Sequence, residues 1–279
     1  MDNNFETREY PMSKSDYDQI ILLAKEYTSI FLDENKKEMI YSRFSRRIRA
    51  LNIKNFTEYL NFLKNNESSE KKEFVNIVTT NVTSFFRENY HFEFLRDKYI
   101  PKHQDKKSIR VWSAGCSSGE EAYSIALCLL ANIKNVNNVG IEITCTDVNT
   151  EVLEVGRQGR YSEDKVSTVP TMYKHQYFNI SKDDALKKNT YEIKPEVKKM
   201  LHFSQMNLLG DWSVQGKFDL IFCRNVIIYF DKITKKLLLN MFADYLHEDG
   251  LLFLGHSENA TNITDRFKYV DKTIYGKEK

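Results

Sequence analysis

The chain has 279 residues, of which 41% are apolar and 29% are charged, and its formal net charge is +2. This composition is typical of a globular protein, and the length suits two domains better than one. The small net charge gives no sign of nucleic-acid or membrane binding. No apolar run approaches the roughly 20 residues that span a bilayer, and the first residues lack a signal-peptide pattern, so we expect a cytoplasmic protein.

The four cysteines lie in apolar or strand-like segments, and none forms a Cys-x-x-Cys pair: Cys116, Cys128, Cys145 and Cys223. No cluster of histidines accompanies them. We therefore expect buried, reduced thiols and no metal site.

Residues 13–80 carry apolar side chains at helical spacing, which predicts a small helical bundle. The four predicted apolar stripes are Tyr17, Ile20, Ile21, Ala24, Tyr27 and Phe31; Ile40, Phe44, Ile48 and Leu51; Phe56, Tyr59, Leu60 and Leu63; and Phe74, Ile77 and Val78. Ser13 or Ser15 can cap the first helix, and the polar stretch 65–70 predicts a turn before the last one. We assign residues 1–75 to an all-α N-terminal domain.

From Arg110 onward the pattern changes to strands that alternate with helices. Strands are predicted at 110–114, 142–146, 201–206, 218–223, 250–255 and 273–275. Helices are predicted at 120–130 and 234–246, and a further helix is predicted to start at 152–157. Such alternation predicts a mostly parallel sheet covered on both faces, with a ligand crevice at the carboxyl ends of the strands. We assign residues 76–279 to a Rossmann-like α/β domain.

Residues 160–200 interrupt this alternation. Two short strands are predicted there, at 173–180 and 191–194, without a helix between them. We interpret the segment as a small β-subdomain inserted into the α/β domain.

A glycine turn follows the first predicted strand, at Gly115-Cys116-Ser117-Ser118-Gly119, and a helix comes next. Such a turn lets the backbone approach a ligand closely. Asp147, at the end of the second strand, can accept hydrogen bonds from two ribose hydroxyls, or it can cap the helix that begins near Thr150. These features indicate a nucleoside-containing cofactor and do not separate nicotinamide from S-adenosylmethionine.

Five motifs in order make the chain resemble the CheR-type chemotaxis receptor methyltransferases. They are TNVTSFFRE (80–88), RVWSAGCSSGEEAYSIAL (110–127), TDVNTEVLEVGRQGRY (146–161), FDLIFCRNVIIYF (218–230) and GLLFLGHSEN (250–259). The resemblance covers nearly the whole chain, and Ala122 stands where the family commonly has a proline. It implies an S-adenosylmethionine-dependent methyltransferase that esterifies glutamate side chains of chemoreceptors.

The resemblance also implies the roles of individual residues. Arg87 and Tyr229 would stand nearest the transferred methyl group, although Tyr229 by itself could equally be a core aromatic residue. Asp147 would contact the ribose, and Asn207 and Leu208 would flank the adenine. The implied cofactor-binding set is Asn81, Thr83, Arg87, Gly115, Glu121, Asp147, Asn207, Leu208, Arg224 and Asn225.

This chemistry needs no strong general base. A glutamate side chain has a pKa of about 4.3 and is already a nucleophilic anion at neutral pH. The protein has only to position the carboxylate and exclude water. Arg87 can hold a carboxylate through two hydrogen bonds, so we expect it to orient the substrate without activating it.

Residues 36–54 form a basic segment in which Arg43, Arg46, Arg47 and Arg49 contribute most of the charge. A solvated helix face is one interpretation, and a docking surface for the acidic methylation helices of a receptor is the other, which the resemblance favours. A nucleic-acid interface is a third, weaker interpretation.

Three alternative functions remain at this stage. An NAD-dependent oxidoreductase would prefer a GxGxxG turn, which is absent. A catalytically silent adaptor would lack the pocket residues, which are present. A methyltransferase acting on another protein substrate is compatible with every motif. Whether the β-subdomain tethers the enzyme to a receptor tail, as in some members of the family, also stays open.

Overall fold

The computed structural model describes residues 5–183 and 188–278, and the chain divides into two units. One unit contains the residues up to Thr80 together with 229–231, and the other contains 81–228 and the residues from 232 onward. The division falls later than the sequence-based boundary at 75, because the last helix of the first unit continues to Val78.

The first unit is helical. Its helices are α1 (Lys14–Thr28), α2 (Lys37–Ala50), α3 (Phe56–Asn65) and α4 (Glu67–Val78), with short 3-10 turns at η1 (Phe5–Thr7) and η2 (Glu34–Lys36). The predicted cap Ser13 is confirmed: its hydroxyl accepts the Asp16 N–H at 3.1 Å, and the Asp16 carboxylate accepts the Ser13 N–H at 2.8 Å. The turn predicted over 65–70 is confirmed but is shorter than expected, because Asn66 alone separates α3 from α4.

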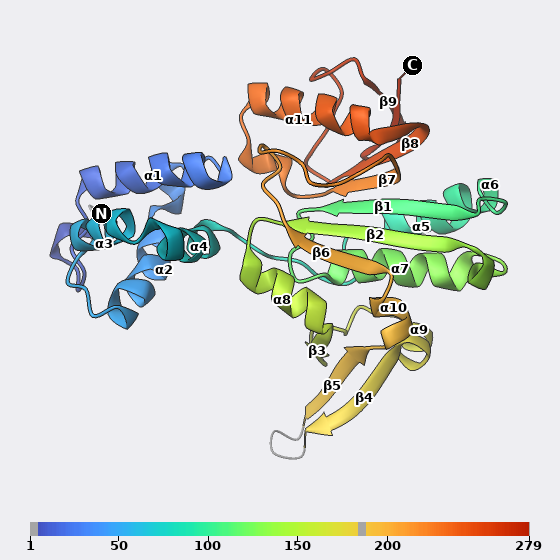
Figure 1. Ribbon diagram of the computed structural model, residues 1–279, viewed down its shortest axis with the longest axis horizontal. Coiled ribbons are helices and arrows are strands. Elements are labelled where there is room, and N and C mark those ends of the chain that lie inside the picture. Colours follow the sequence, from blue (N-terminus) through green and yellow to red (C-terminus); the bar gives the residue numbers. More distant parts are fainter. Residues whose placement is uncertain (1–4, 184–187, 279) are drawn as a thin grey trace. The chain divides into compact units, whose positions relative to one another are not determined.

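The second unit is built on a seven-stranded sheet (Figure 1). Its strands are β1 (Ser108–Ala114), β2 (Gly140–Asp147), β6 (Leu201–Gln205), β7 (Phe218–Cys223), β8 (Leu246–Leu254), β9 (Phe267–Asp271) and β10 (Ile274–Lys277). They lie in the order β6-β2-β1-β7-β8-β10-β9, and β10 runs in the direction opposite to the other six strands. The edge strand β9 was not predicted, because three of its five side chains are exposed and it lacks an apolar run.

Helices cover both faces of this sheet. The helices α7 (Glu120–Asn132) and α8 (Thr150–Gln158) lie on one face, and α11 (Lys232–Tyr245) lies on the other (Figure 1). Alternation along β1 explains the division, since Val111 joins the core beneath α7 while Trp112 packs against Phe242 of α11, with ring centroids 5.3 Å apart. The predicted Rossmann-like α/β fold after an all-α domain is confirmed. The segments α5 (Tyr90–Phe94), η3 (Leu95–Tyr99), α6 (Ile100–Lys102) and η4 (Val136–Asn138) complete this part.

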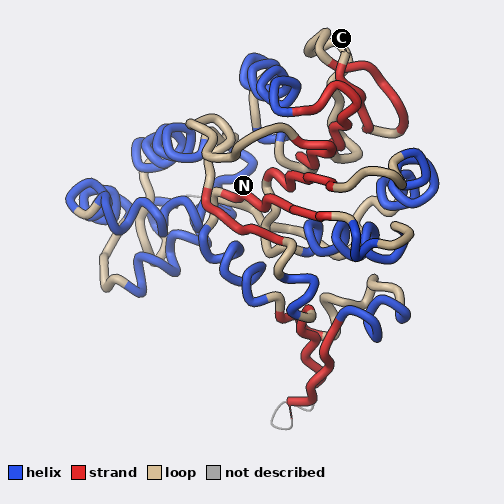
Figure 2. Tube along the Cα trace, turned by 45° about the vertical axis from the view of Figure 1, so that its right-hand side comes forward, coloured by secondary structure: helices blue, strands red, loops and turns tan. Residues whose placement is uncertain are grey.

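The insertion forms a separate three-stranded antiparallel sheet in the order β3-β5-β4, which projects from the larger sheet (Figure 2). Its elements are β3 (Arg160–Ser162), α9 (Thr171–Tyr177), β4 (Phe178–Asp183), β5 (Lys188–Ile193) and α10 (Pro195–Lys198). The predicted strand at 173–180 is wrong over most of its length. Tyr173 and Tyr177 lie four residues apart on α9 and pack ring against ring, a contact that helical spacing allows.

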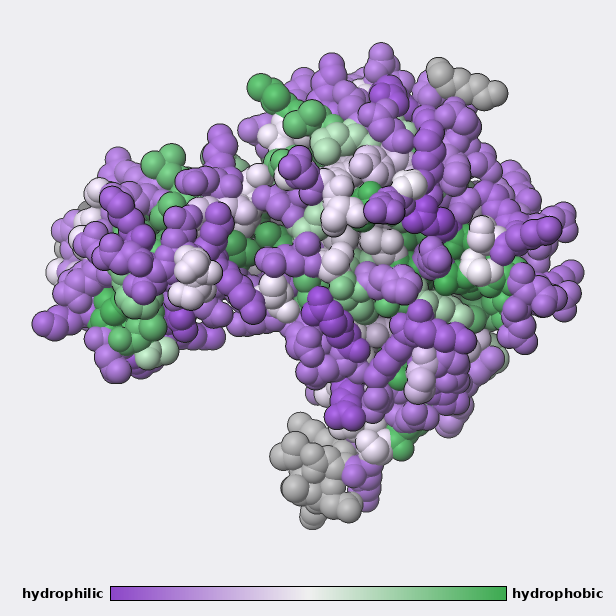
Figure 3. Space-filling view, in the orientation of Figure 1, coloured by the Kyte–Doolittle hydropathy of each residue, from purple (hydrophilic) through white to green (hydrophobic). Residues whose placement is uncertain are grey.

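All four cysteines are free and buried, as predicted. Within 5–183 and 188–278, no group of His, Cys, Asp and Glu side chains is arranged to hold a metal ion. None of the helices in the described part of the chain combines the length and apolarity needed to cross a bilayer. On the face drawn in Figure 3, hydrophilic residues cover most of the surface.

Candidate functional site

Six of the predicted cofactor-binding residues lie at one edge of the large sheet. Strands β6, β2, β1, β7 and β8 are parallel, so their carboxyl ends meet there. Residues at or after these strand ends are Gly115, Asp147, Asn207, Leu208, Arg224 and Asn225. The structure therefore brings together residues that are far apart in the sequence, as the strand pattern predicted.

The glycine turn after β1 is closely packed. Gly115 has φ 85°, and a Cβ atom there would lie 2.5 Å from Cγ2 of Val226. The N–H groups of Gly115 and Cys116 both donate to the Thr146 carbonyl, at 2.8 and 2.9 Å. Only glycine satisfies both the backbone conformation and the space at position 115.

Asp147 lies at the end of β2 and is almost fully buried. Its carboxylate oxygens accept the N–H groups of Ser117 and Asn149, each at 2.9 Å. The alternative that Asp147 caps α8 is wrong, because the side chain of Asn149 accepts the N–H groups of Glu151 and Val152 there. Burial raises the pKa of Asp147, although the main-chain hydrogen bonds act to lower it. A carboxylate has about four acceptor sites, so the hydrogen bonds from the main chain do not exhaust its capacity to accept another donor.

Arg87 sits on a strained turn. Phe86 and Glu88, on either side of it, have φ values of 53° and 55°, a left-handed conformation that bulky residues rarely adopt. The Phe86 N–H donates to the Ser124 hydroxyl at 2.9 Å, which fixes the turn against α7. The Arg87 guanidinium donates to the Val82 carbonyl at 2.9 Å and forms no ion pair with any residue that the structure describes.

The start of the same segment also lies at this edge. The Asn81 carbonyl accepts the Ser117 hydroxyl at 3.3 Å, and Thr83 is half-buried. Asn81 and Thr83 therefore belong to the same unit as the glycine turn, and their contacts with a cofactor stay a prediction.

Arg224 is the buried centre of an ionic network, with only 2% of its side chain exposed. It donates to Glu121 at 3.1 Å, lies 3.3 Å from Glu88 and donates to the main-chain carbonyl of Arg87. Glu121 also accepts the Ser113 hydroxyl at 2.6 Å. Arg224 thus joins the end of β7 to α7 and to the Arg87 turn.

Sequence reasoning missed Glu88, although it is the last residue of the motif that contains Arg87. Its carboxylate accepts Asn225 Nδ2 at 3.3 Å and lies 3.1 Å from the His256 ring. An acidic side chain that directly follows a functional arginine was the available signal.

The two carboxylates beside Arg224 differ in their pKa values. Burial acts to raise the pKa of Glu88, but the Arg224 charge and hydrogen bonds from His256 and Asn225 lower it to about 2. Burial raises the pKa of Glu121, and Arg224 and Ser113 only partly offset this effect. Burial and the charge of Arg224 also lower the pKa of the neighbouring His91 to about 3, so this imidazole is neutral at pH 7.

Asn207 and Leu208 lie in the loop after β6. The Asn207 side-chain oxygen accepts the Leu209 N–H at 3.0 Å, and the Leu208 carbonyl accepts the Trp212 indole N–H at 2.9 Å. Trp212 in turn packs edge to face on Trp112 of β1, with ring centroids 4.7 Å apart. The loop is therefore fixed to the sheet, while its predicted contact with the adenine stays a prediction.

Tyr229, the second predicted catalytic residue, belongs to the helical unit. Its carbonyl accepts the Phe31 N–H at 3.0 Å. No observation within either unit tests its predicted role at the transferred methyl group.

The basic helix α2 presents less free charge than its sequence suggests. Arg43 donates to the carbonyls of Ile77 and Thr79. The other pairings are Arg47 with Glu70 and Arg49 with Glu9. Arg46 is exposed and forms no ion pair with a described residue. The predicted docking role of these four arginines is untested, and Arg46 retains the most accessible charge for it.

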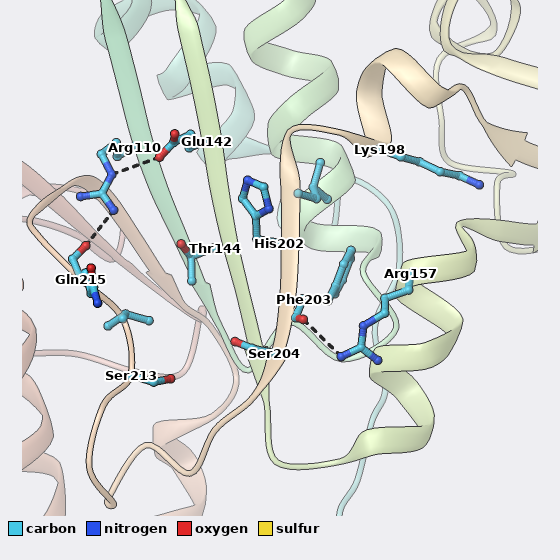
Figure 4. Close-up of a pocket in the computed structure, with 12 residues that line it drawn as sticks. Arg110, Glu142, Thr144, Arg157, Lys198, His202, Phe203, Ser204, Ser213 and Gln215 are labelled. Atoms are coloured by element: carbon cyan, nitrogen blue, oxygen red, sulfur yellow. Dashed lines mark hydrogen bonds and ion pairs between the residues drawn. The ribbon is translucent and has the colours of Figure 1, made fainter.

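A cavity of about 740 Å³ lies elsewhere, over β1, β2 and β6 (Figure 4). None of the predicted site residues lines it. Arg110, on its wall, already donates to the Gln215 carbonyl at 2.7 Å and lies 3.4 Å from Glu142. We therefore do not assign the cofactor to this cavity.

Comparisons with known proteins agree with this geometry. Residues 15–79 match the all-alpha domain of CheR methyltransferases, and residues 81–276 match their SAM binding domain. A chemotaxis protein methyltransferase of Borreliella burgdorferi is 39% identical over 275 residues, covering 95% of each chain. Chemotaxis protein methyltransferase 2 of Pseudomonas aeruginosa is 37% identical, covering 97% of this chain and 96% of that protein. The chemotaxis protein methyltransferase of Escherichia coli is 37% identical, covering 98% and 94%.

The match over both units sets aside the oxidoreductase alternative, because the cofactor domain is one that binds S-adenosylmethionine. The same family assignment follows from the seven-stranded sheet, from the preceding helical unit and from the similarity over nearly the whole chain. This chain belongs to the CheR methyltransferase family and is an S-adenosylmethionine-dependent methyltransferase.

Proposed function

We propose that this protein transfers a methyl group from S-adenosylmethionine to glutamate side chains in the cytoplasmic domains of chemoreceptors, forming methyl esters. The printed names of its relatives, chemotaxis protein methyltransferases, support this class of substrate. The structural observation that carries the proposal is Arg87, a guanidinium that pairs with no carboxylate of the described residues and lies beside the buried Arg224 network.

The side chains at the sheet edge fit the polar groups of the proposed cofactor. S-adenosylmethionine carries an ammonium group, a carboxylate and two ribose hydroxyls, which require acceptors and a cation. Asp147 retains capacity to accept a hydrogen bond from the ribose, and Glu121 and Arg224 offer a carboxylate and a guanidinium for the amino-acid part. The glycine at 115 keeps the backbone open to close approach.

When bound, this cofactor supplies a methyl group on a positively charged sulfur. The substrate carboxylate would accept this methyl group on one oxygen, with a new C–O bond in place of the C–S bond, and the sulfur would become a neutral thioether. No proton moves, because the glutamate is ionised at neutral pH. Arg87 would hold the second oxygen of the carboxylate and direct the first toward the methyl carbon.

The chemical stability of the product tests this proposal. A carboxyl methyl ester is hydrolysed by mild alkali and releases volatile methanol, whereas N-methyl groups are stable under those conditions. The purified enzyme would be incubated with methyl-labelled S-adenosylmethionine and a chemoreceptor cytoplasmic fragment from the same organism. We expect alkali-labile label on the fragment, and none on a fragment whose methylatable glutamates are replaced by glutamine.

Two results would count against this function. Label that resists alkali would indicate another methyl acceptor, and equal labelling of the glutamine-substituted fragment would remove glutamate as the acceptor. An Arg96→Ala enzyme is the matched control for Arg87→Ala. Arg96 is an exposed arginine in the same unit as Arg87, and its hydrogen bonds go to Asp97. It is expected to label the fragment as the unmodified enzyme does.

A further inference from the structure

Glu258 is a buried carboxylate that the proposed mechanism has not used. It lies four residues after the end of β8, and only 5% of the residue is exposed. Its two oxygens accept main-chain N–H groups, including those of Gly255 at 2.6 Å, Asn225 at 2.9 Å and Ile228 at 3.1 Å. Burying an ionised group is unfavourable unless such bonds compensate it, so this arrangement needs a reason.

These three N–H groups come from two different loops. Gly255 belongs to the loop after β8, whereas Asn225 and Ile228 belong to the turn after β7. Glu258 therefore joins these two loops through one side chain. Burial raises the pKa of Glu258, and the main-chain hydrogen bonds act against that rise.

The packing around this carboxylate leaves no space for a different arrangement. A Cβ atom at Gly255 would lie 2.8 Å from the Asn225 nitrogen and 2.9 Å from Oε2 of Glu258. On the other side, Val226 fills the space in front of Gly115. The turn after β7 is thus held between the β8 loop and the glycine turn after β1.

This turn carries the two side chains that hold the Arg87 segment. Arg224 donates to the main-chain carbonyl of Arg87 and lies 3.3 Å from Glu88. Asn225 donates to the other oxygen of Glu88 at 3.3 Å. Any shift of the turn would therefore move both anchors of the segment that presents Arg87.

We propose that Glu258 is a positioning residue for methyl transfer. Its carboxylate fixes the turn after β7, so that Arg224 and Asn225 hold Arg87 and the cofactor-binding edge in place. The inference rests on the proposed function for its kinetic readout. Its binding readout, affinity for S-adenosylhomocysteine, depends only on membership of an S-adenosylmethionine-binding family. The two readouts allow a failure of this inference to be distinguished from a failure of the proposed substrate.

The test is Glu258→Gln, in which one carboxylate oxygen becomes an NH2 group that faces main-chain donors. We expect kcat for methyl transfer to fall about tenfold or more, because small displacements of positioned groups have effects of this size. We also expect weaker binding of S-adenosylhomocysteine by titration calorimetry. Glu258→Asp keeps both acceptor oxygens and is expected to recover part of each loss.

Asp219→Asn is the matched control. Asp219 is also buried and accepts a main-chain N–H, that of Arg110 at 2.8 Å, but it lies at the amino end of β7, away from the site. It would lose stability as Glu258→Gln does, while kcat and S-adenosylhomocysteine affinity stay at the wild-type level. If Glu258→Gln does not fold, Gly255→Ala disturbs the same turn while leaving the Glu258 side chain intact.

The outcomes separate clearly. A folded Glu258→Gln or Gly255→Ala protein with wild-type kcat and wild-type S-adenosylhomocysteine affinity would overturn the inference. Loss of both in Asp219→Asn as well would also overturn it, because the effect would then follow from stability alone. If the wild-type enzyme does not methylate the receptor fragment, the proposed substrate is wrong, and the calorimetric comparison still decides the role of Glu258.

Discussion

Both units of the protein bury an arginine–glutamate contact, but only in the sheet unit is the arginine buried as well. In the helical unit the Glu70 carboxylate is 2% exposed and Arg47 is 28% exposed. In the sheet unit the Arg224 side chain is 2% exposed, with Glu88 and Glu121 around it. A surface cation stabilises a buried acid in the first case, whereas two acids and a carbonyl stabilise a buried cation in the second.

The difference separates a contact that serves packing from one that lies at the predicted cofactor site. Glu70 also accepts the Tyr59 hydroxyl at 3.0 Å, so its pair joins α2, α3 and α4 and serves packing. Arg224 joins the end of β7 to α7 and to the Arg87 turn, near the predicted cofactor-binding residues at the strand ends. Buried charges retained at such a position are expected to be sensitive to loss of one partner.

The largest effect is expected from Arg224→Met. Removing this cation leaves Glu88 and Glu121 without their main partner, which costs about 3–5 kcal/mol of unfolding free energy. Urea denaturation followed by circular dichroism measures the loss. Arg47→Met is the comparison in the helical unit, with an expected loss of about 1–3 kcal/mol because Tyr59 still donates to Glu70. Equal losses would remove the distinction between the two contacts.

The next largest effect is on activity. Arg87→Ala is expected to lower kcat about 100-fold, because the substrate carboxylate loses its orientation. Its unfolding free energy should change by only about 0.5 kcal/mol, since the side chain makes one hydrogen bond to a main-chain carbonyl. Initial rates and urea denaturation of the same preparation check both parts. A fully active Arg87→Ala enzyme would show that this arginine does not hold the substrate.

A smaller effect concerns pH. His91 is buried near Arg224, Glu88 and Asp271, and burial with the Arg224 charge lowers its pKa from 6.5 to about 3. The unfolded chain therefore binds more protons than the folded chain as pH falls below 6.5, and stability decreases by about 1.4 kcal/mol per pH unit from this group. We expect this slope between pH 6.5 and 4.5, because Glu88 begins to be protonated in the unfolded chain only near 4.5.

His91→Gln removes the titrating group while retaining a polar partner for the Thr273 hydroxyl, which lies 3.0 Å from His91 Nε2. Its stability should depend less on pH than that of the wild type over this interval. Urea midpoints measured at pH 6.5 and 4.5 give the two slopes. Parallel slopes would mean that His91 is protonated in the folded protein.

The smallest effect is expected at the surface of α2. Arg46→Glu should slow methylation of the receptor fragment about fivefold at low salt, which corresponds to about 1 kcal/mol for an exposed charge. The difference should shrink as salt rises, and S-adenosylhomocysteine affinity should not change. Lys25→Glu, on the exposed side of α1, is the control for a general change of charge. Equal slowing in both variants would contradict docking on α2.

The sequence by itself determined the class of fold and the places where the site forms. Strand patterns placed the glycine turn, Asp147 and Arg224 at strand ends, and parallel strands bring such ends to one edge. The spacing of apolar residues located all four helices of the first unit. These features are encoded in contiguous residues, which is why they are readable without a structure.

Tertiary structure alone decided which charged side chains are paired and which are available. The arginines of α2 look equivalent in the sequence, yet Arg43 and Arg47 are occupied by α4, and only Arg46 is exposed without an ion pair among the described residues. Two of the partners of Glu258 are Asn225 and Ile228, more than 25 positions away in the chain. Such pairings depend on how strands and helices pack, because local propensity carries no information about distant partners.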